Sequence, residues 1–122
     1  MTIDRDNVLR TASPEAVRLY RSLRAVLRPI GAFREELKKT SVHFVRGSAF
    51  VGVHFRRSHL LVTIKAASPI DSPRIVKAAQ VSKNRWHCEV KVSAETEIDC
   101  DLTAWMKTAY DLCLDRRQDL LS

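Results

Sequence analysis

Three short runs of alternating residues between positions 40 and 66 constrain the fold of this chain more than any other feature. Apolar residues alternate with polar ones in each run, and polar breaks at Gly47-Ser48 and Arg57-Ser58 separate the runs. Such alternation is typical of strands with one buried face, and two-residue breaks are typical of hairpin turns. The segment therefore predicts three consecutive antiparallel strands.

The apolar residues also predict how these strands pair. A turn at residues 47–48 places Phe44 opposite Val51, and a turn at residues 57–58 places Val53 opposite Val62. Because side chains alternate between the two faces, a shift of one residue would move a whole apolar set to the wrong side. One face is therefore predicted to be aliphatic. The other is predicted to be polar with some apolar members, and to carry His43, Val45, Phe50, His54, Arg56, His59, Leu61, Lys65 and, from a later strand, His87.

Two more strands are predicted at residues 74–81 and 86–92. The second alternates without error, with its apolar residues from Trp86 to Val92 on one side and His87, Glu89 and Lys91 on the other. This is the pattern of a half-buried antiparallel strand. The first is ambiguous, because its two alanines suit a helical turn as well as an edge strand. We interpret it as a strand.

A helix is predicted on each side of these strands. Ser13 can cap the first helix, because its side chain can accept from free backbone amides and Pro14 is tolerated in the first turn. An apolar stripe at helical spacing follows from Ala16 to Leu27. The second helix is predicted to begin at Asp99, with apolar residues recurring at intervals of three and four as far as Cys113.

These elements predict a two-layer α+β fold. An antiparallel sheet of about five strands has one strongly apolar face, and the N- and C-terminal helices can bury their stripes by packing on that face. Residues 13–122 are expected to form this single domain, and residues 1–12 a flexible N-terminal lead-in. A chain of 122 residues is long enough to bury a core of its own.

The sequence also bounds the compartment. It contains no apolar run of about 18 residues and no signal-peptide pattern, so we expect a cytoplasmic protein without a membrane partner. Cys88, Cys100 and Cys113 are odd in number and widely spaced. We expect them to be reduced thiols that mostly occupy core positions.

No motif in the chain predicts catalysis. The four histidines invite a metal or acid–base hypothesis, but cations neighbour them and no carboxylate is placed to orient a histidine pair. The three glycines have backbone or turn explanations, so they form no phosphate-binding loop. We therefore expect no catalytic residue, no metal and no cofactor, and an enzyme is the least favoured class.

Charge offers one route to a function. The chain has 21 Lys and Arg residues against 14 Asp and Glu residues, a formal net charge of +7. Such an excess favours polyanionic partners, although an arginine-rich solvated surface would look the same. The candidate residues for binding nucleic acid or another phosphate-rich anion are Arg18, Arg21, Arg24, Arg56 and Arg57.

The polar sheet face offers another route. Val45, Phe50 and Leu61 are many apolar residues for a face that no predicted helix covers. The favoured hypothesis is a binding or interaction domain without catalysis, which uses this face for protein–protein contact. The partner could be a second copy of the chain, as in a homodimer, or another protein. Nucleic-acid binding through the basic surface is the alternative.

The order of several short motifs resembles a known family. These motifs are Thr40-Ser41-Val42-His43-Phe44, Ala49-Phe50-Val51-Gly52-Val53, Leu60-Leu61-Val62-Thr63-Ile64, Ser72-Pro73-Arg74-Ile75, Trp86-His87 and Glu97-Ile98-Asp99, followed by Leu102, Trp105 and Ala109-Tyr110. Over residues 17–113 the chain is similar to the domain of unknown function 5655 family, small bacterial and archaeal domains found alone or at the end of longer proteins. The resemblance implies a fold and a bacterial setting. It implies no activity and no functional residues.

Overall fold

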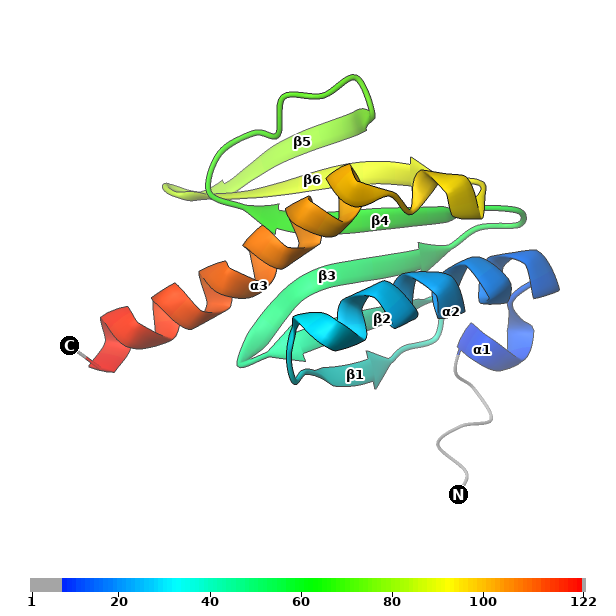
Figure 1. Cartoon of the computed structure of the whole chain (residues 1–122), viewed down its shortest axis with the longest axis horizontal. Helices are drawn as coiled ribbons and strands as arrows, with labels where there is room; N and C mark the ends of the chain where they lie inside the picture. The colour runs from blue at the N-terminus through cyan, green and yellow to red at the C-terminus, as the bar shows by residue number, and fades with distance from the viewer. Residues whose placement is uncertain (1–7, 122) are drawn as a thin grey trace.

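A six-stranded antiparallel sheet forms one layer of the protein, and helices form the other (Figure 1). The computed structural model describes residues 8–121, with side chains for residues 8–113. The strands are β1 (Arg34–Leu37), β2 (Ser41–Arg46), β3 (Ser48–Phe55), β4 (Leu60–Ala66), β5 (Ile75–Ser82) and β6 (Arg85–Val92). The helices are α1 (Val8–Thr11), α2 (Pro14–Leu27) and α3 (Cys100–Leu121), with single 3₁₀ turns η2 (Arg28–Ile30) and η3 (Glu95–Glu97).

The α+β class and the antiparallel sheet are confirmed, and the strand count rises from about five to six. The order across the sheet is β1-β2-β3-β4-β6-β5. The added strand, β1, is a short edge strand beside β2. The sequence of β1 is REEL, which has no alternating apolar residues. The segment is therefore a strand because it pairs with β2, and not because of its own hydrophobic pattern. The ambiguous segment near residues 74–81 is the other edge strand, β5.

The predicted register is confirmed along most of β2, β3 and β4. Phe44 lies opposite Val51, and Val53 lies opposite both Val42 and Val62. The side chains of these residues are almost completely buried, and they form one cluster with the apolar residues of the helices. The alternation of apolar residues thus predicted the core face of the three central strands correctly.

Phe50 is the exception, because it lies in the core and not on the polar face. Phe44 pairs with Val51, but Val45 pairs with Ala49, so Phe50 is an extra residue on β3. Such a bulge interrupts the alternation of side chains along the strand. Two consecutive residues, Phe50 and Val51, therefore both turn their side chains toward the core. Phe50 is 1% exposed, and its ring centroid lies 5.3 Å from that of Tyr110 on α3.

The helices cover the apolar face of the sheet and leave the other face open. Figure 1 shows α2 and α3 side by side on the same side of the strands. The Ser13 hydroxyl caps α2 by accepting from the Ala16 amide at 3.1 Å, as expected. From α2, Tyr20 and Leu23 enter the same core as Leu102 and Met106 of α3. The core therefore lies between the helices and one face of the sheet.

The packed domain begins earlier than the predicted boundary at Ser13. Residues 8–11 form α1, and Val8 is buried in the core. The Val8 amide also donates to the Lys38 carbonyl at 3.0 Å, which ties α1 to the chain just after β1. The prediction of a flexible lead-in is therefore wrong for residues 8–12, and residues 1–7 lie outside the described part of the chain. Among the described residues, no helix is long and apolar enough to cross a membrane.

We expect Phe50→Ala to lower the free energy of unfolding by about 3–5 kcal/mol, because it removes a large buried ring. Leu61→Ala is the matched control. Leu61 is only half-buried on the open face, so its loss is expected to cost about 1 kcal/mol or less. Urea unfolding followed by circular dichroism measures both. Equal losses in the two variants would contradict the bulged position of Phe50.

Candidate functional site

The open face of the sheet carries most of the predicted contact residues. His43, Gly52, Thr63 and Glu89 form one row of cross-strand neighbours, and Ser41, His54, Leu61 and Lys91 form the next. Lys65 is paired with His87 in a third row. We call these three rows, together with Val45, Arg56 and His59, the open face. Its histidines come from four different segments, so only sheet pairing brings them together.

Two apolar members of the open face differ in their surroundings. Leu61 lies on this face as predicted, where it is half-buried between His54 and Lys91. Val45 is 6% exposed but does not belong to the hydrophobic core cluster. With Phe50 in the core, the open face is less apolar than the sequence indicated. Its chemistry is mainly that of imidazoles and cations.

A hollow of about 300 Å³ lies in the middle of the open face. It is lined by His43, Gly52, His54, Thr63, Lys65 and His87, among others. Gly52 leaves room beside the imidazoles, because a Cβ atom there would lie 3.3 Å from the His43 ring. The rings of His43 and His54 lie edge to face, with their centroids 6.3 Å apart. Gly52 and Thr63 were not predicted as site residues, although the predicted register of the two hairpins already places Gly52 opposite both His43 and Thr63.

The electrostatic surroundings favour the neutral form of two histidines on this face, His54 and His59. Burial, and then Arg56 and His43, lower the pKa of His54, while Glu89 raises it. Burial, Lys91 and Arg56 lower the pKa of His59. Both side chains therefore ionise below the ordinary histidine pKa of about 6.5. A bound anion would act in the opposite direction and favour the charged imidazole.

Lys65 occupies the end of the hollow nearest α3. Its side chain is 9% exposed, and its Nζ donates to Ser48 Oγ at 2.9 Å and to Cys113 Sγ at 3.9 Å. These contacts join β4 to the start of β3 and to α3. Cys113 and Cys88 are buried, as expected for core thiols, whereas Cys100 is exposed at the start of α3.

The predicted anion-binding arginines separate into three places. Arg18 and Arg21 line a hollow of about 590 Å³ with Leu9, Ala12, Pro14, Val17 and Ser22. Arg56 and Arg57 line another, of about 360 Å³, together with Lys39 and part of α1. Both hollows include Ala12, and neither has an acidic side chain among its lining residues. Lys39 is a member of this basic surface that was not among the predicted anion-binding residues.

Arg24 is part of a different cluster, around a buried carboxylate. Its guanidinium lies 3.6 Å from Glu35 on β1, which also pairs with Arg28 at 3.0 Å and accepts a hydrogen bond from the Tyr20 hydroxyl. Burial, and the hydrogen bond to Glu35, raise the pKa of Tyr20. Arg24 therefore stabilises the contact between α2 and β1, and it does not join Arg18 and Arg21 in an anion site.

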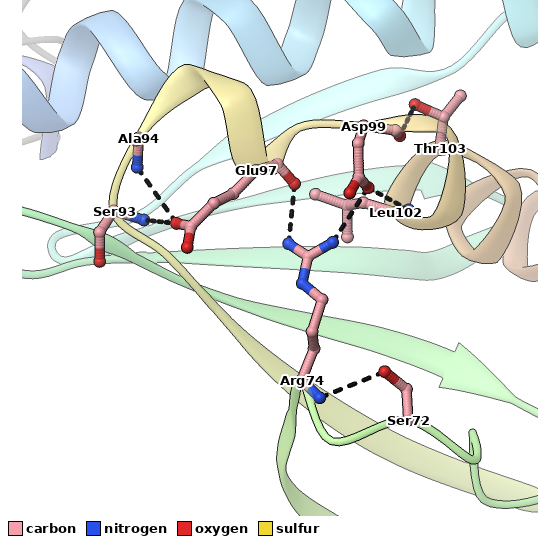
Figure 2. Close-up of polar contacts among 8 residues, drawn as sticks. All are labelled: Ser72, Arg74, Ser93, Ala94, Glu97, Asp99, Leu102 and Thr103. Carbon is pink, nitrogen blue, oxygen red and sulfur yellow. Dashed lines mark hydrogen bonds and ion pairs between the residues drawn. The ribbon is translucent and has the colours of Figure 1, made fainter.

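A second polar cluster holds the start of α3 against the segment before β5. Figure 2 shows the Arg74 guanidinium between two acceptors, Asp99 Oδ1 at 2.9 Å and the Glu97 carbonyl at 2.7 Å. Asp99 also accepts from the Leu102 amide at 3.0 Å, so it caps α3 as predicted. Each contact drawn in this cluster joins two groups of the protein itself. We assign it to holding the fold together and not to function.

Among residues 8–113, no group of three or more His, Cys, Asp and Glu side chains is arranged to hold a metal ion. Two carboxylates flank the hollow in register: Glu36 lies opposite His43, and Glu89 lies opposite Thr63. What the open face offers is a set of imidazole, hydroxyl and ammonium donors around a shallow recess.

These features define a class of protein: a small α+β domain with one sheet face buried under helices and the other exposed around a polar hollow. Comparison with protein families narrows the class. The chain belongs to the family described as Domain of unknown function (DUF5655), whose model matches residues 5–113. The family predicted from the short motifs is therefore confirmed. Neither the curated proteins nor the solved structures contain a significant match.

We expect Asp99→Ala to cost about 1–2 kcal/mol of stability at pH 7, because the helix cap is lost together with the contact to Arg74. The Leu102 amide, and then Arg74, lower the pKa of Asp99, so its stabilising effect is present above the unfolded pKa of about 3.9 and is lost as the pH falls through the folded value. Urea unfolding at pH 7 and near pH 3 measures the difference. Asp71→Ala, in an exposed loop, is the control and should change stability little at either pH.

Proposed function

We propose that this protein is a binding module without catalysis of its own, and that its open sheet face contacts an acidic surface of a partner protein. The observation that carries this proposal is the open face, where His43, His54, His87 and Lys65 line a hollow and His59, Arg56 and Lys91 lie outside it on the same face. Half-buried Leu61 supplies apolar contact area among these polar groups. A mixture of this kind is suited to a protein interface with a charged rim.

Charge favours a different protein over a second copy of the chain. The two acidic residues near the open face are already opposed by cations. Glu36 pairs with Arg34 at 2.8 Å, and Glu89 lies opposite Lys77. Two copies meeting through this face would therefore bring cations and imidazoles against one another, which costs energy. A partner that presents Asp and Glu side chains would be complementary.

The first test compares two double variants with the same change in charge. Arg56→Glu/Lys91→Glu reverses two exposed cations of the open face, and Arg18→Glu/Arg21→Glu reverses two on α2. The probe is fluorescent poly-L-glutamate, followed by anisotropy at low salt. We expect the open-face variant to bind about tenfold more weakly than the wild type, as for the loss of two exposed ion pairs, and the α2 variant to bind almost unchanged.

Three results would contradict the proposal. The first is no binding of poly-L-glutamate by the wild type. The second is equal weakening in the two variants, which would mean that only net charge matters. The third is a wild-type dimer in light scattering that Leu61→Glu dissociates, which would make a second copy the occupant of this face.

The basic surface around α1 supports nucleic-acid binding as a second candidate function. Arg18, Arg21, Lys39, Arg56 and Arg57 line two hollows that share Ala12 and have no acidic lining residue. Such a surface would bind phosphates through charge, without reading sequence.

For this candidate, duplex DNA of about 20 base pairs should bind at about 50 mM salt and dissociate as salt rises toward 200 mM. Arg18→Glu/Arg21→Glu should weaken binding at least about tenfold, since several phosphate contacts are lost. A mobility-shift assay measures both. The absence of any shift at low salt would exclude this function.

A further inference from the structure

The hollow on the open face has the composition of an anion site. His43 and His54 flank Gly52, while Thr63 and His87 come from the neighbouring strands β4 and β6. All of these side chains except that of Gly52 can donate a hydrogen bond, and the lining residues include no carboxylate. The volume of about 300 Å³ lies at the lower end of the range for ligand pockets. A single small group therefore fits the space better than a whole ligand of drug size.

The recess exists because position 52 has no side chain. A Cβ atom at Gly52 would come within 3.3 Å of the His43 ring and 3.9 Å of His54 Nε2, so a larger residue would occupy the space between the imidazoles. The two rings stand edge to face, which leaves their nitrogen atoms at different orientations around this space. Ala49, Phe50 and Val51 of β3 also line the hollow, so its donors stand beside apolar residues.

We propose that this hollow receives one carboxylate side chain, from Asp or Glu, of the acidic partner, and holds it more tightly as His54 becomes protonated. This inference rests on the proposed function and names the chemistry of its central contact. A carboxylate accepts hydrogen bonds only, and it would therefore match the imidazole, hydroxyl and ammonium donors that line the hollow. A metal cation would meet Arg56 and Lys65 beside the same imidazoles, which disfavours it.

The groups around the hollow place the protonation of His54 below pH 7. His54 faces Ser41 on β2 and Leu61 on β4, and it responds to Arg56, His43 and Glu89. His87 and Lys65 lie at the end of the hollow, and Glu36 lies opposite His43. Burial and neighbouring cations keep His54 neutral at pH 7 when the site is empty. A bound carboxylate favours the imidazolium, so it raises the pKa of His54, and its contribution to affinity grows as the pH falls below about 6.5.

The test uses two identical substitutions at different places on one face. His54→Gln removes the charge inside the hollow, and His59→Gln removes a charge outside it. The probe is a glutamate octapeptide with blocked ends, measured by anisotropy and by NMR of the histidine ring signals at pH 7.5 and pH 5.5. We expect wild-type affinity to rise about tenfold between these values, since Glu carboxylates remain ionised above their pKa of about 4.3. His59→Gln should keep this rise, and His54→Gln should reduce it to about twofold or less.

The NMR signals give a second reading that does not depend on affinity alone. The ring signals of His43, His54 and His87 should move together on peptide addition, while that of His59 moves less. Gly52→Ala, which partly fills the hollow, should weaken binding at pH 5.5, with unchanged unfolding confirming that the variant is folded. Thr63→Val tests the hydroxyl donor without changing the size of the side chain.

The outcomes separate this inference from the proposed function. If the octapeptide binds and Arg56→Glu/Lys91→Glu weakens it, but His54→Gln and His59→Gln behave alike, the open face is an interaction surface and the carboxylate site is wrong. If no probe binds at either pH, both proposals fail. If inorganic phosphate at the same concentration displaces the peptide and moves the same ring signals further, the hollow is a phosphate site and the carboxylate assignment is overturned.

Discussion

The strict alternation of side chains along β2, β3 and β4 is the constraint on which the rest of this structure depends. It gathers the aliphatic residues of three strands on one face, and burial of that face requires α2 and α3 to lie on the same side. The same alternation forces the polar residues to the opposite face, where they cannot be covered by the same helices. The open face is therefore a direct consequence of the core, and its histidines come together because the aliphatic residues are buried.

The bulge at Phe50 shows how one departure from this alternation changes both faces. An extra residue on β3 turns a large aromatic ring into the core, beside Phe33, Phe44 and Tyr110. It also removes that ring from the open face, which becomes more polar. The result favours contacts with charged or hydrogen-bonding groups over the broad apolar contact that the sequence suggested. A single backbone irregularity thus changes the chemistry that the open face presents.

The distribution of cations has more functional meaning than the net charge of +7. Arg24, Arg28 and Arg74 are used internally, to hold β1 against α2 and to hold the start of α3. Among the exposed cations, Arg18, Arg21, Lys39 and Arg57 line the hollows around α1, Lys91 lies on the open face, and Arg56 belongs to both. The sequence cannot separate these groups, because it does not show which arginines form ion pairs and which are exposed to solvent.

Local patterns in the sequence determined the class of fold, the register of the central strands, the caps at Ser13 and Asp99, and the family. Each of these follows from residues close together in the chain, through alternation, helical spacing or a capping side chain. Tertiary structure alone decided the strand character of β1, the core position of Phe50, the packing of Val8 and the hollow around Gly52. These features depend on pairing partners and on packing between distant segments, and the hydrophobic pattern of the segment itself does not contain that information.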